Sequence, residues 1–215
     1  MSRSSARLEK GIGGLALLVA AAVTMAATPV GQRAAGRAAV TRPVANAACA
    51  SDLGTGVKTK RRFCDVVIAS TARESVSVSI PPHAGAAALM FDLHNRFTVP
   101  PAGADAAQAF TSHTAVVAII TSTGELIERA AASRVYRTVS DLFDRIGPAA
   151  RGSAPKIVAP GQAQAIRVEI PAGVSAVGIV GTRLEEWRAT GRGAFDNPNK
   201  PIAMVSNLRI EYVPR

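Results

Sequence analysis

The stretch Ala87–Pro100, AALMFDLHNRFTVP, combines core-type and site-type residues more densely than any other part of the chain. Successive side chains of a β-strand point to opposite faces. In this stretch one parity is apolar and the other carries an acid, an imidazole and a base, as the two sets Leu89, Phe91, Leu93, Phe97 and Met90, Asp92, His94, Arg96 show. We therefore predict a strand that packs its first set into a core and presents its second set on the opposite face.

The rest of the chain repeats this strand-like patterning. Short apolar or alternating runs are separated by Pro, Gly and Asn, which end strands and form turns. Further strands are expected over 63–69, 75–80, 114–122, 126–136, 156–159, 165–170, 176–188 and 202–213. Many short strands with almost no helix predict an all-β fold, a two-sheet antiparallel β-sandwich of jelly-roll-like type.

One short helix is expected near 140–146, SDLFDRI. Ser140 suits an N-cap, Asp141 the first turn, and Gly147 with Pro148 a stop signal.

Two segments resemble each other in their order of features. In each, an alternating strand ends at proline and leads through a short turn into an apolar strand, first from Val76 to Leu93 and again from Ile166 to Leu184. This similarity predicts two hairpins at related places of two packed sheets.

The last strand carries a resemblance to a known family. The run Ser206–Tyr212, SNLRIEY, together with the overall patterning, resembles the closing strand of jelly-roll carbohydrate-binding modules of the galactose-binding-like fold. The resemblance implies a β-sandwich and assigns no ligand residues. The chain departs from these modules because they usually present aromatic residues to the sugar, whereas Trp187 is its only tryptophan.

The N-terminus is typical of an exported protein. Three basic residues precede Gly11–Ala27, an apolar run rich in Ala, Leu and Val, as in a secretory signal peptide. An uncleaved inner-membrane anchor over 11–27 is the alternative reading of residues 1–27. We expect export to the periplasm or the exterior.

A linker and one domain follow. Residues 28–48, rich in Ala, Arg and Pro, lack an apolar period and predict a disordered linker. Residues 49–215 then form a single β-sandwich domain. The net charge is +10, and residues 1–48, with six basic residues and one acid, hold half of it.

The two cysteines predict one disulfide. Cys49 and Cys64 are the only pair in the chain, and an even number in an exported protein indicates a bond. We expect it to pin the entering segment onto the first strand. Two unpaired buried thiols are the alternative.

The first candidate ligand face consists of Asp92, His94 and Arg96. Along a strand these side chains recur about every 6.6–7 Å, which is too far for direct contact, so each needs partners on neighbouring strands. They indicate either an acid/base site built around His94 or, as the favoured interpretation, a polar strand face or buried salt-bridge cluster.

Metal and catalytic motifs are sparse. A metal site would require the scattered His83, His94 and His113 to meet, and no spacing among them matches a known ligand motif. No nucleophile elbow or phosphate loop is present. Glu185 and Glu186 flank Trp187, but neighbours on a strand face opposite ways and would not act together. We expect no cofactor.

A second candidate contact is a basic cluster of Lys58, Lys60, Arg61 and Arg62. It suits an anionic polymer, although a solvated loop end is the favoured interpretation. The aromatic content of 4% speaks against the stacking platforms of single-strand nucleic-acid binders.

These features predict a secreted, non-enzymatic β-sandwich that binds, or forms part of, the cell envelope, with a glycan or a protein as partner. The alternative is a metal-dependent or acid/base hydrolase that uses His94 with Asp92 and either His83 or His113. A third hypothesis is an assembly subunit, which an exposed apolar edge strand would favour.

Overall fold

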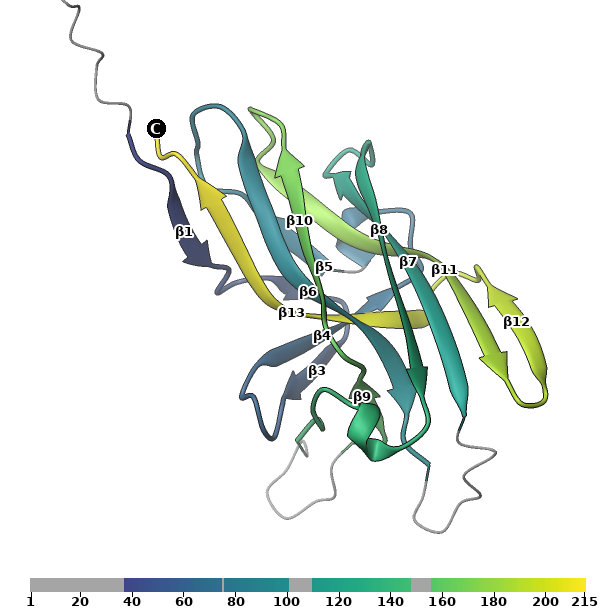
Figure 1. Ribbon diagram of the computed structural model, residues 1–215. Helices are drawn as coiled ribbons and strands as arrows, with labels where there is room; N and C mark the ends of the chain where they lie inside the picture. Colours follow the sequence, from purple (N-terminus) through teal and green to yellow (C-terminus); the bar gives the residue numbers. More distant parts are fainter. Residues whose placement is uncertain (1–36, 75, 101–109, 148–155) are drawn as a thin grey trace, which may run out of the picture. The chain divides into compact units, whose positions relative to one another are not determined.

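Residues 37–74, 76–100, 110–147 and 156–215 are described by a computed structural model, and all their strand ladders are antiparallel (Figure 1). The predicted signal peptide or anchor, residues 1–27, lies outside the described residues. In chain order the strands are β1 Val40–Pro43, β2 Ala48–Cys49, β3 Asp52–Thr55, β4 Arg62–Val67, β5 Val76–Ser79, β6 Ala87–Thr98, β7 Thr111–Thr121, β8 Leu126–Tyr136, β9 Val158–Pro160, β10 Gln164–Ile170, β11 Ala176–Arg188, β12 Gly191–Phe195 and β13 Pro201–Tyr212.

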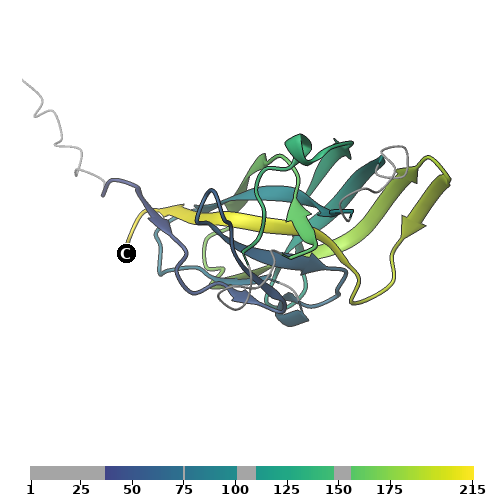
Figure 2. The same cartoon turned by 90° about the horizontal axis from the view of Figure 1, so that it is seen from below.

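The strands form two sheets that pack face to face within residues 37–215 (Figure 2). Sheet A has the order β10-β6-β13-β4-β3, with β1 paired to β13 and β9 paired to β6. Sheet B has the order β2-β5-β11-β7-β8, with β12 paired to β11. This arrangement confirms the predicted all-β, two-sheet antiparallel sandwich.

Strand β6 confirms the predicted alternation. Leu89, Phe91, Leu93 and Phe97 are each at most 1% exposed. The first three belong to the core between the sheets. Asn95 shares this inward face, and its Nδ2 donates hydrogen bonds to the backbone carbonyls of His113 and Ala132 on sheet B.

Strand β13 changes faces part-way along its length. Ala203 and Val205 face the core, and beyond a bulge between Ser206 and Arg209 the inward positions become the even ones, including Ile210 and Tyr212. Asn207 occupies the bulge with φ of 55°, a left-handed conformation that asparagine tolerates well. The single extra residue of the bulge therefore reverses which side chains point into the core in the second half of the strand.

Sheet A is also covered on its outer face. A second apolar cluster gathers there from both β-strands and loops, and consists of Leu53, Phe63, Ile146, Val158 and Met204 with Phe143 against it. Backbone hydrogen bonds hold the covering segment 142–147 in place, for example from Val57 N to Arg145 O at 2.8 Å. Both faces of β6 are therefore enclosed at this point.

The two similar segments are not hairpins, so that prediction is wrong. Strands β5 and β11 belong to sheet B, whereas β6 and β10 belong to sheet A. Each proline-ended turn thus carries the chain across from one sheet to the other. One connection joins β5 to β6 and the other joins β10 to β11. The two are reciprocal in that each strand of one pairs with a strand of the other, β6 with β10 and β5 with β11. Proline stops each ladder, as predicted, and the next strand then finds its partners in the facing sheet.

The short helix is smaller than predicted. A single 3₁₀ turn covers Val139–Asp141, and Thr138, not Ser140, is its N-cap. The expected helix face from Leu142 to Ile146 is extended instead, with bridges to Gly161 and Gly56. Its apolar residues cover the outer face of sheet A, so tertiary burial outweighs the local helix signal. A second 3₁₀ turn spans Ala72–Glu74.

The sandwich begins before Cys49, and the predicted linker over 28–48 is wrong from Val40 onward. Strand β1 pairs with β13, and Ala47 is 5% exposed. The edge of strand β13 that β4 leaves unpaired is taken up by β1, whose first residue, Val40, packs against the core. Three of the four residues of β1 are exposed, so no apolar period marks the strand in the sequence.

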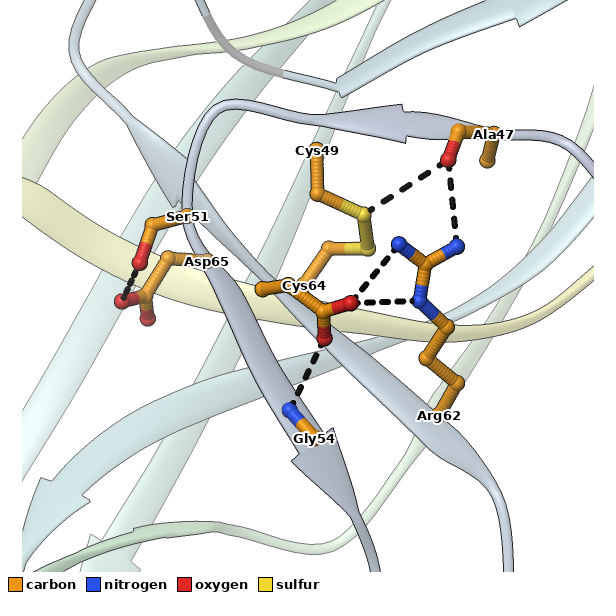
Figure 3. The surroundings of a disulfide bond; sticks show 8 residues. Ala47, Cys49, Ser51, Gly54, Arg62, Cys64 and Asp65 are labelled. Carbon is orange, nitrogen blue, oxygen red and sulfur yellow. Dashed lines mark hydrogen bonds and ion pairs between the residues drawn. A yellow bond between two sulfur atoms is a disulfide. The ribbon is translucent and has the colours of Figure 1, made fainter. Parts of the chain in front are cut away.

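Cys49 and Cys64 form the predicted disulfide, and this bond joins the two sheets (Figure 3). Cys49 lies in β2 of sheet B and Cys64 in β4 of sheet A, with 5.6 Å between their Cα atoms. Beside the bond, Arg62 donates hydrogen bonds to the Asp52 carboxylate and to the Ala47 carbonyl. The entering segment is thereby fixed to both layers.

The double variant Cys49→Ser/Cys64→Ser should lose about 3 kcal/mol of unfolding free energy. The bond closes a loop of 15 residues, and the chain-entropy model gives this value for such a loop. Urea denaturation of the two proteins measures the difference. A reductant should lower the parent to the level of the variant and leave the variant unchanged, and equal midpoints for parent and variant would contradict the prediction.

Candidate functional site

The residues Asp92, His94 and Arg96 share the outer face of sheet A, and each has its own partners. Arg61 Nη1 lies 2.6 Å from Asp92 Oδ2. Arg96 Nε lies 2.9 Å from Asp65 Oδ1. These three side chains therefore make separate cross-strand contacts, and they do not converge on a common point.

His94 is fully buried and has hydrogen bonds at both ring nitrogens. Nδ1 donates to the Gly161 carbonyl at 2.8 Å, which leaves Nε2 to accept from the Ser206 hydroxyl at 3.0 Å. The rings of Phe63 and Phe143 pack against the imidazole, with centroids 5.5 Å and 5.0 Å away. Burial lowers the pKa of His94, and the Gly161 hydrogen bond opposes this only in part, so the neutral form dominates near pH 7.

A serine that donates to a buried histidine resembles a nucleophile with its base, but this pair is closed to solvent. Ser206 is 1% exposed and His94 is 0% exposed. A nucleophile must reach the substrate, whereas both side chains lie beneath Phe143 and its neighbours. The pair acts in the packing of sheet A.

The three histidines lie in three different surroundings. His83 Nδ1 bonds to the Pro81 carbonyl, next to the turn between β5 and β6. His113 of β7 bonds to Glu186 of β11, while His94 lies on the outer face of sheet A. Within the described residues, no group of three or more His, Cys, Asp and Glu side chains is placed to hold a metal ion.

The basic cluster is largely engaged in local contacts. Arg61 pairs with Asp92 and lies over the Phe143 ring, Arg62 pairs with Asp52, and Lys60 Nζ donates to the Val57 carbonyl.

The buried carboxylate of Asp144 anchors the loop that carries Lys58. It accepts hydrogen bonds from the backbone N–H groups of Lys58 and Thr59 and from the Thr59 hydroxyl. Burial tends to raise the pKa of Asp144, but these hydrogen bonds outweigh it and the net shift is downward.

A polar surface that no sequence pattern predicts covers part of sheet B. Strand register places Arg192, Trp187, Ser112 and Val135 in one row across four strands. The next rows contain Glu185, Thr114 and Ser133, then Arg183, Val116 and Ala131. These ten residues are named here the sheet-B outer face.

Contacts within the sheet-B outer face confirm that its members share one side of the sheet. Arg183 and Arg192 both pair with Glu185, at 3.0 and 3.1 Å. The Arg192 guanidinium lies 4.8 Å from the centroid of the Trp187 ring, and the tryptophan remains 51% exposed. The surface therefore presents a held, half-exposed indole among charged and hydroxyl groups.

Glu185 and Glu186 point to opposite sides of β11, as strand geometry predicts. Glu185 belongs to the sheet-B outer face, whereas Glu186 turns inward and bonds to His113 at 3.0 Å. Burial tends to raise the pKa of Glu186, but hydrogen bonds from Arg188 and His113 outweigh it, so the pKa is lowered and the carboxylate is ionised.

Comparisons with known proteins show neither a family nor a function for this chain. No protein-family model and no curated protein sequence matches the chain. Among solved structures, the K1 cleaved adhesin domain of Lys-gingipain from Porphyromonas gingivalis is similar at 12% sequence identity with a TM-score of 0.31. The match covers 83% of this chain and 99% of that one. A likeness of this size carries no functional argument, and the jelly-roll assignment stays a prediction.

His94→Gln should flatten the pH dependence of stability. Below pH 6.5 the unfolded chain takes up protons that the folded state, with its lowered His94 pKa, does not, so stability falls as pH falls. The slope is at most about 1.4 kcal/mol per pH unit for each such histidine. Urea unfolding at pH 7.0 and 5.5 measures it.

The His94→Gln variant should be less stable than the parent at pH 7.0 and lose less between pH 7.0 and 5.5. His113→Gln is the matched comparison, since burial also lowers the pKa of His113. Identical losses in parent and His94→Gln would show that His94 takes no part in the acid sensitivity.

Proposed function

We propose that this chain is an exported, non-enzymatic binding module of the cell envelope, and that it contacts an envelope polysaccharide through the sheet-B outer face. The single observation that carries the proposal is Trp187, which is half exposed and lies against Arg192 in the row of the sheet-B outer face nearest the end of β11. A large exposed aromatic residue held in a fixed orientation supplies contact area at low entropic cost.

The surroundings of Trp187 suit a polymer rich in hydroxyl groups. Ser112, Thr114 and Ser133 provide hydroxyls that both donate and accept hydrogen bonds. The ion pairs of Glu185 with Arg183 and Arg192 add acceptors and donors, and the carboxylate offsets one of the two arginine charges. A surface of this kind favours a neutral, polar partner over a strongly charged one.

Export is supported by the N-terminal pattern and by the disulfide. Disulfides form and persist in oxidising compartments, and this one links the two sheets. In the part of the chain that the structure describes, there is no helix long and apolar enough to cross a bilayer.

The hydrolase alternative has weaker support. His94, its central residue, is enclosed, and Asp92 serves as the partner of Arg61 and Asn207.

The assembly alternative needs an exposed apolar edge strand. Strand β8 ends sheet B, but it carries Glu128, Arg129 and Arg134, and charges on an edge discourage pairing with further strands. Arg134 also reaches across to Ala163 and Gln164.

Trp187→Ala should weaken polysaccharide binding at least tenfold, because exposed tryptophans at an interface often contribute more than about 1.4 kcal/mol. The full chain is tested in pull-down against insoluble peptidoglycan, chitin and cellulose. Since Trp187 is the only tryptophan, its fluorescence reports directly on soluble fragments of any polymer that binds. A blue shift on binding is the expected result.

Ile157→Ala provides the control for this experiment. Ile157 is an exposed apolar residue, at 69% exposure, and it lies beside β9 and away from sheet B. It should bind like the parent. If Trp187→Ala also binds like the parent, the sheet-B outer face is not the contact surface, and binding of envelope proteins without any polysaccharide would overturn the choice of partner.

A further inference from the structure

A hollow of about 230 Å³ lies beside the end of β11 where Trp187 is found. It opens where β6 ends and β7 begins, two strands of opposite sheets. Its lining combines hydroxyl groups, an acid–base pair, a guanidinium and an aromatic ring, from Thr98, Pro100, Phe110, Thr111, His113, Glu186 and Arg188. A concave site with a few polar groups directed into it is typical of small-ligand binding.

Only one of the two oxygens of the Glu186 carboxylate accepts hydrogen bonds from the described residues. Oε1 accepts from His113 Nε2 at 3.0 Å, from Arg188 Nε at 2.7 Å, and from the Thr111 hydroxyl at 3.4 Å. None of the described residues donates a hydrogen bond to Oε2. The carboxylate is thus fixed in position and keeps one oxygen as an acceptor for a ligand.

Arg188 provides the matching donor. Its Nε and Nη2 contact Glu186, whereas Nη1 has no partner among the described residues. The side chain is 61% exposed, so a ligand can reach it. The lining of the hollow therefore includes both an ionised carboxylate oxygen and a guanidinium N–H. Because the two charges compensate each other, neither an anion nor a cation is favoured.

His113 positions this pair and takes no part in proton transfer. It is 7% exposed, and its Nε2 is occupied by Glu186. Nδ1 is buried away from solvent, so it cannot serve a substrate as a base. Burial lowers the pKa of His113, which favours the neutral ring. Because the ionised Glu186 carboxylate can only accept, Nε2 is the ring nitrogen that carries the proton.

We infer that this hollow binds one neutral polyhydroxylated unit, with a vicinal diol placed against Glu186 and Arg188. A hydroxyl group both donates and accepts, so two adjacent hydroxyls satisfy Oε2 and Nη1 together. The Phe110 ring and the Thr98 and Thr111 hydroxyls give the unit one apolar and one polar wall. The inference rests on the proposed polysaccharide function and names the unit that it recognises.

The size of the hollow sets a limit on its ligand. Sites for drug-sized molecules measure about 300–1,000 Å³. At about 230 Å³ the hollow takes a single sugar-sized unit or the end of a longer chain. Trp187 adjoins Glu186 and Arg188 in sequence but faces the other side of β11, so the hollow and the sheet-B outer face are separate contact surfaces.

The test uses the full chain with methyl glycosides of glucose, galactose and mannose, followed by saturation-transfer NMR. At least one glycoside should bind in the millimolar range, and Glu186→Gln should weaken it at least tenfold. The charged analogues glucuronic acid and glucosamine should bind more weakly than their neutral parents. Arg188→Met removes an exposed side chain with little risk to folding and should have the same effect.

Glu169→Gln is the matched control, because Glu169 is an exposed glutamate of β10 in sheet A and belongs neither to the hollow nor to the sheet-B outer face. It should leave the glycoside affinity within twofold of the parent. Urea unfolding of Glu186→Gln shows whether a loss reflects folding, in which case Arg188→Met decides. If no glycoside binds, or if Glu186→Gln and Arg188→Met both bind normally, the inference is overturned.

The glycoside test of the hollow and the polymer test of the sheet-B outer face can succeed or fail independently. Polymer binding that depends on Trp187, with no glycoside binding, overturns the hollow and supports the sheet-B outer face. Glycoside binding that depends on Glu186, with polymer binding indifferent to Trp187→Ala, supports the hollow and overturns the sheet-B outer face.

Discussion

Strand β6 is enclosed on both faces, and the rest of the structure depends on this double burial. Its odd positions fill the core between the sheets, and its even position His94 lies under a second apolar cluster. A polar group buried on such a strand costs free energy unless it has a hydrogen-bond partner. The ring nitrogens of His94 and the amide nitrogen of Asn95 have partners in other segments of the chain, whereas Asn95 Oδ1 has none among the described residues.

This constraint explains why the most chemically promising residues contribute little to a site. Asp92, His94 and Arg96 are held by Arg61, Ser206 and Asp65 beneath or beside the segment that covers sheet A. Their charges and hydrogen bonds are satisfied within the protein. Groups with unused hydrogen-bonding capacity among the described residues lie instead beside the end of β11 in sheet B.

The fold was predictable where burial follows local alternation. Val76, Val78 and Ile80 are all buried, and the ambiguous, alanine-rich segment 126–136 is the strand β8. Ser75, the first residue of the expected strand 75–80, lies outside the described residues. Alternation predicts which residues share a face of a strand, but it does not predict the sheet to which the strand belongs. The sequence therefore predicts hairpins after Pro81 and Pro171, where the chain in fact crosses from one sheet to the other.

Other features depend on contacts that no local pattern encodes. Strand β1, with three of its four residues exposed, is set by its pairing with β13, and Leu142 to Ile146 follow tertiary burial. Strand β12, in a stretch rich in Gly and Asn, is set by its pairing with β11.

The site residues were harder to predict for the same reason. The sheet-B outer face gathers side chains from four strands that are up to 80 residues apart in sequence. Trp187 was visible in the sequence only as a lone aromatic residue beside two glutamates. Strand parity correctly separated Glu185 from Glu186, but their partners, Arg192 and His113, lie on other strands.

The reciprocal crossings between the sheets have a consequence for the order of folding. Strand β5 needs β11, and β6 needs β9, β10 and β13, all of which come at least 60 residues later in the chain. Pairings of such long range make folding slow and leave early strands without partners during synthesis. Local pairs such as β7 with β8 can form early, whereas β6 lacks its sheet partners until the later strands are available. Delayed completion of sheet A is compatible with the proposed export of an unfolded chain.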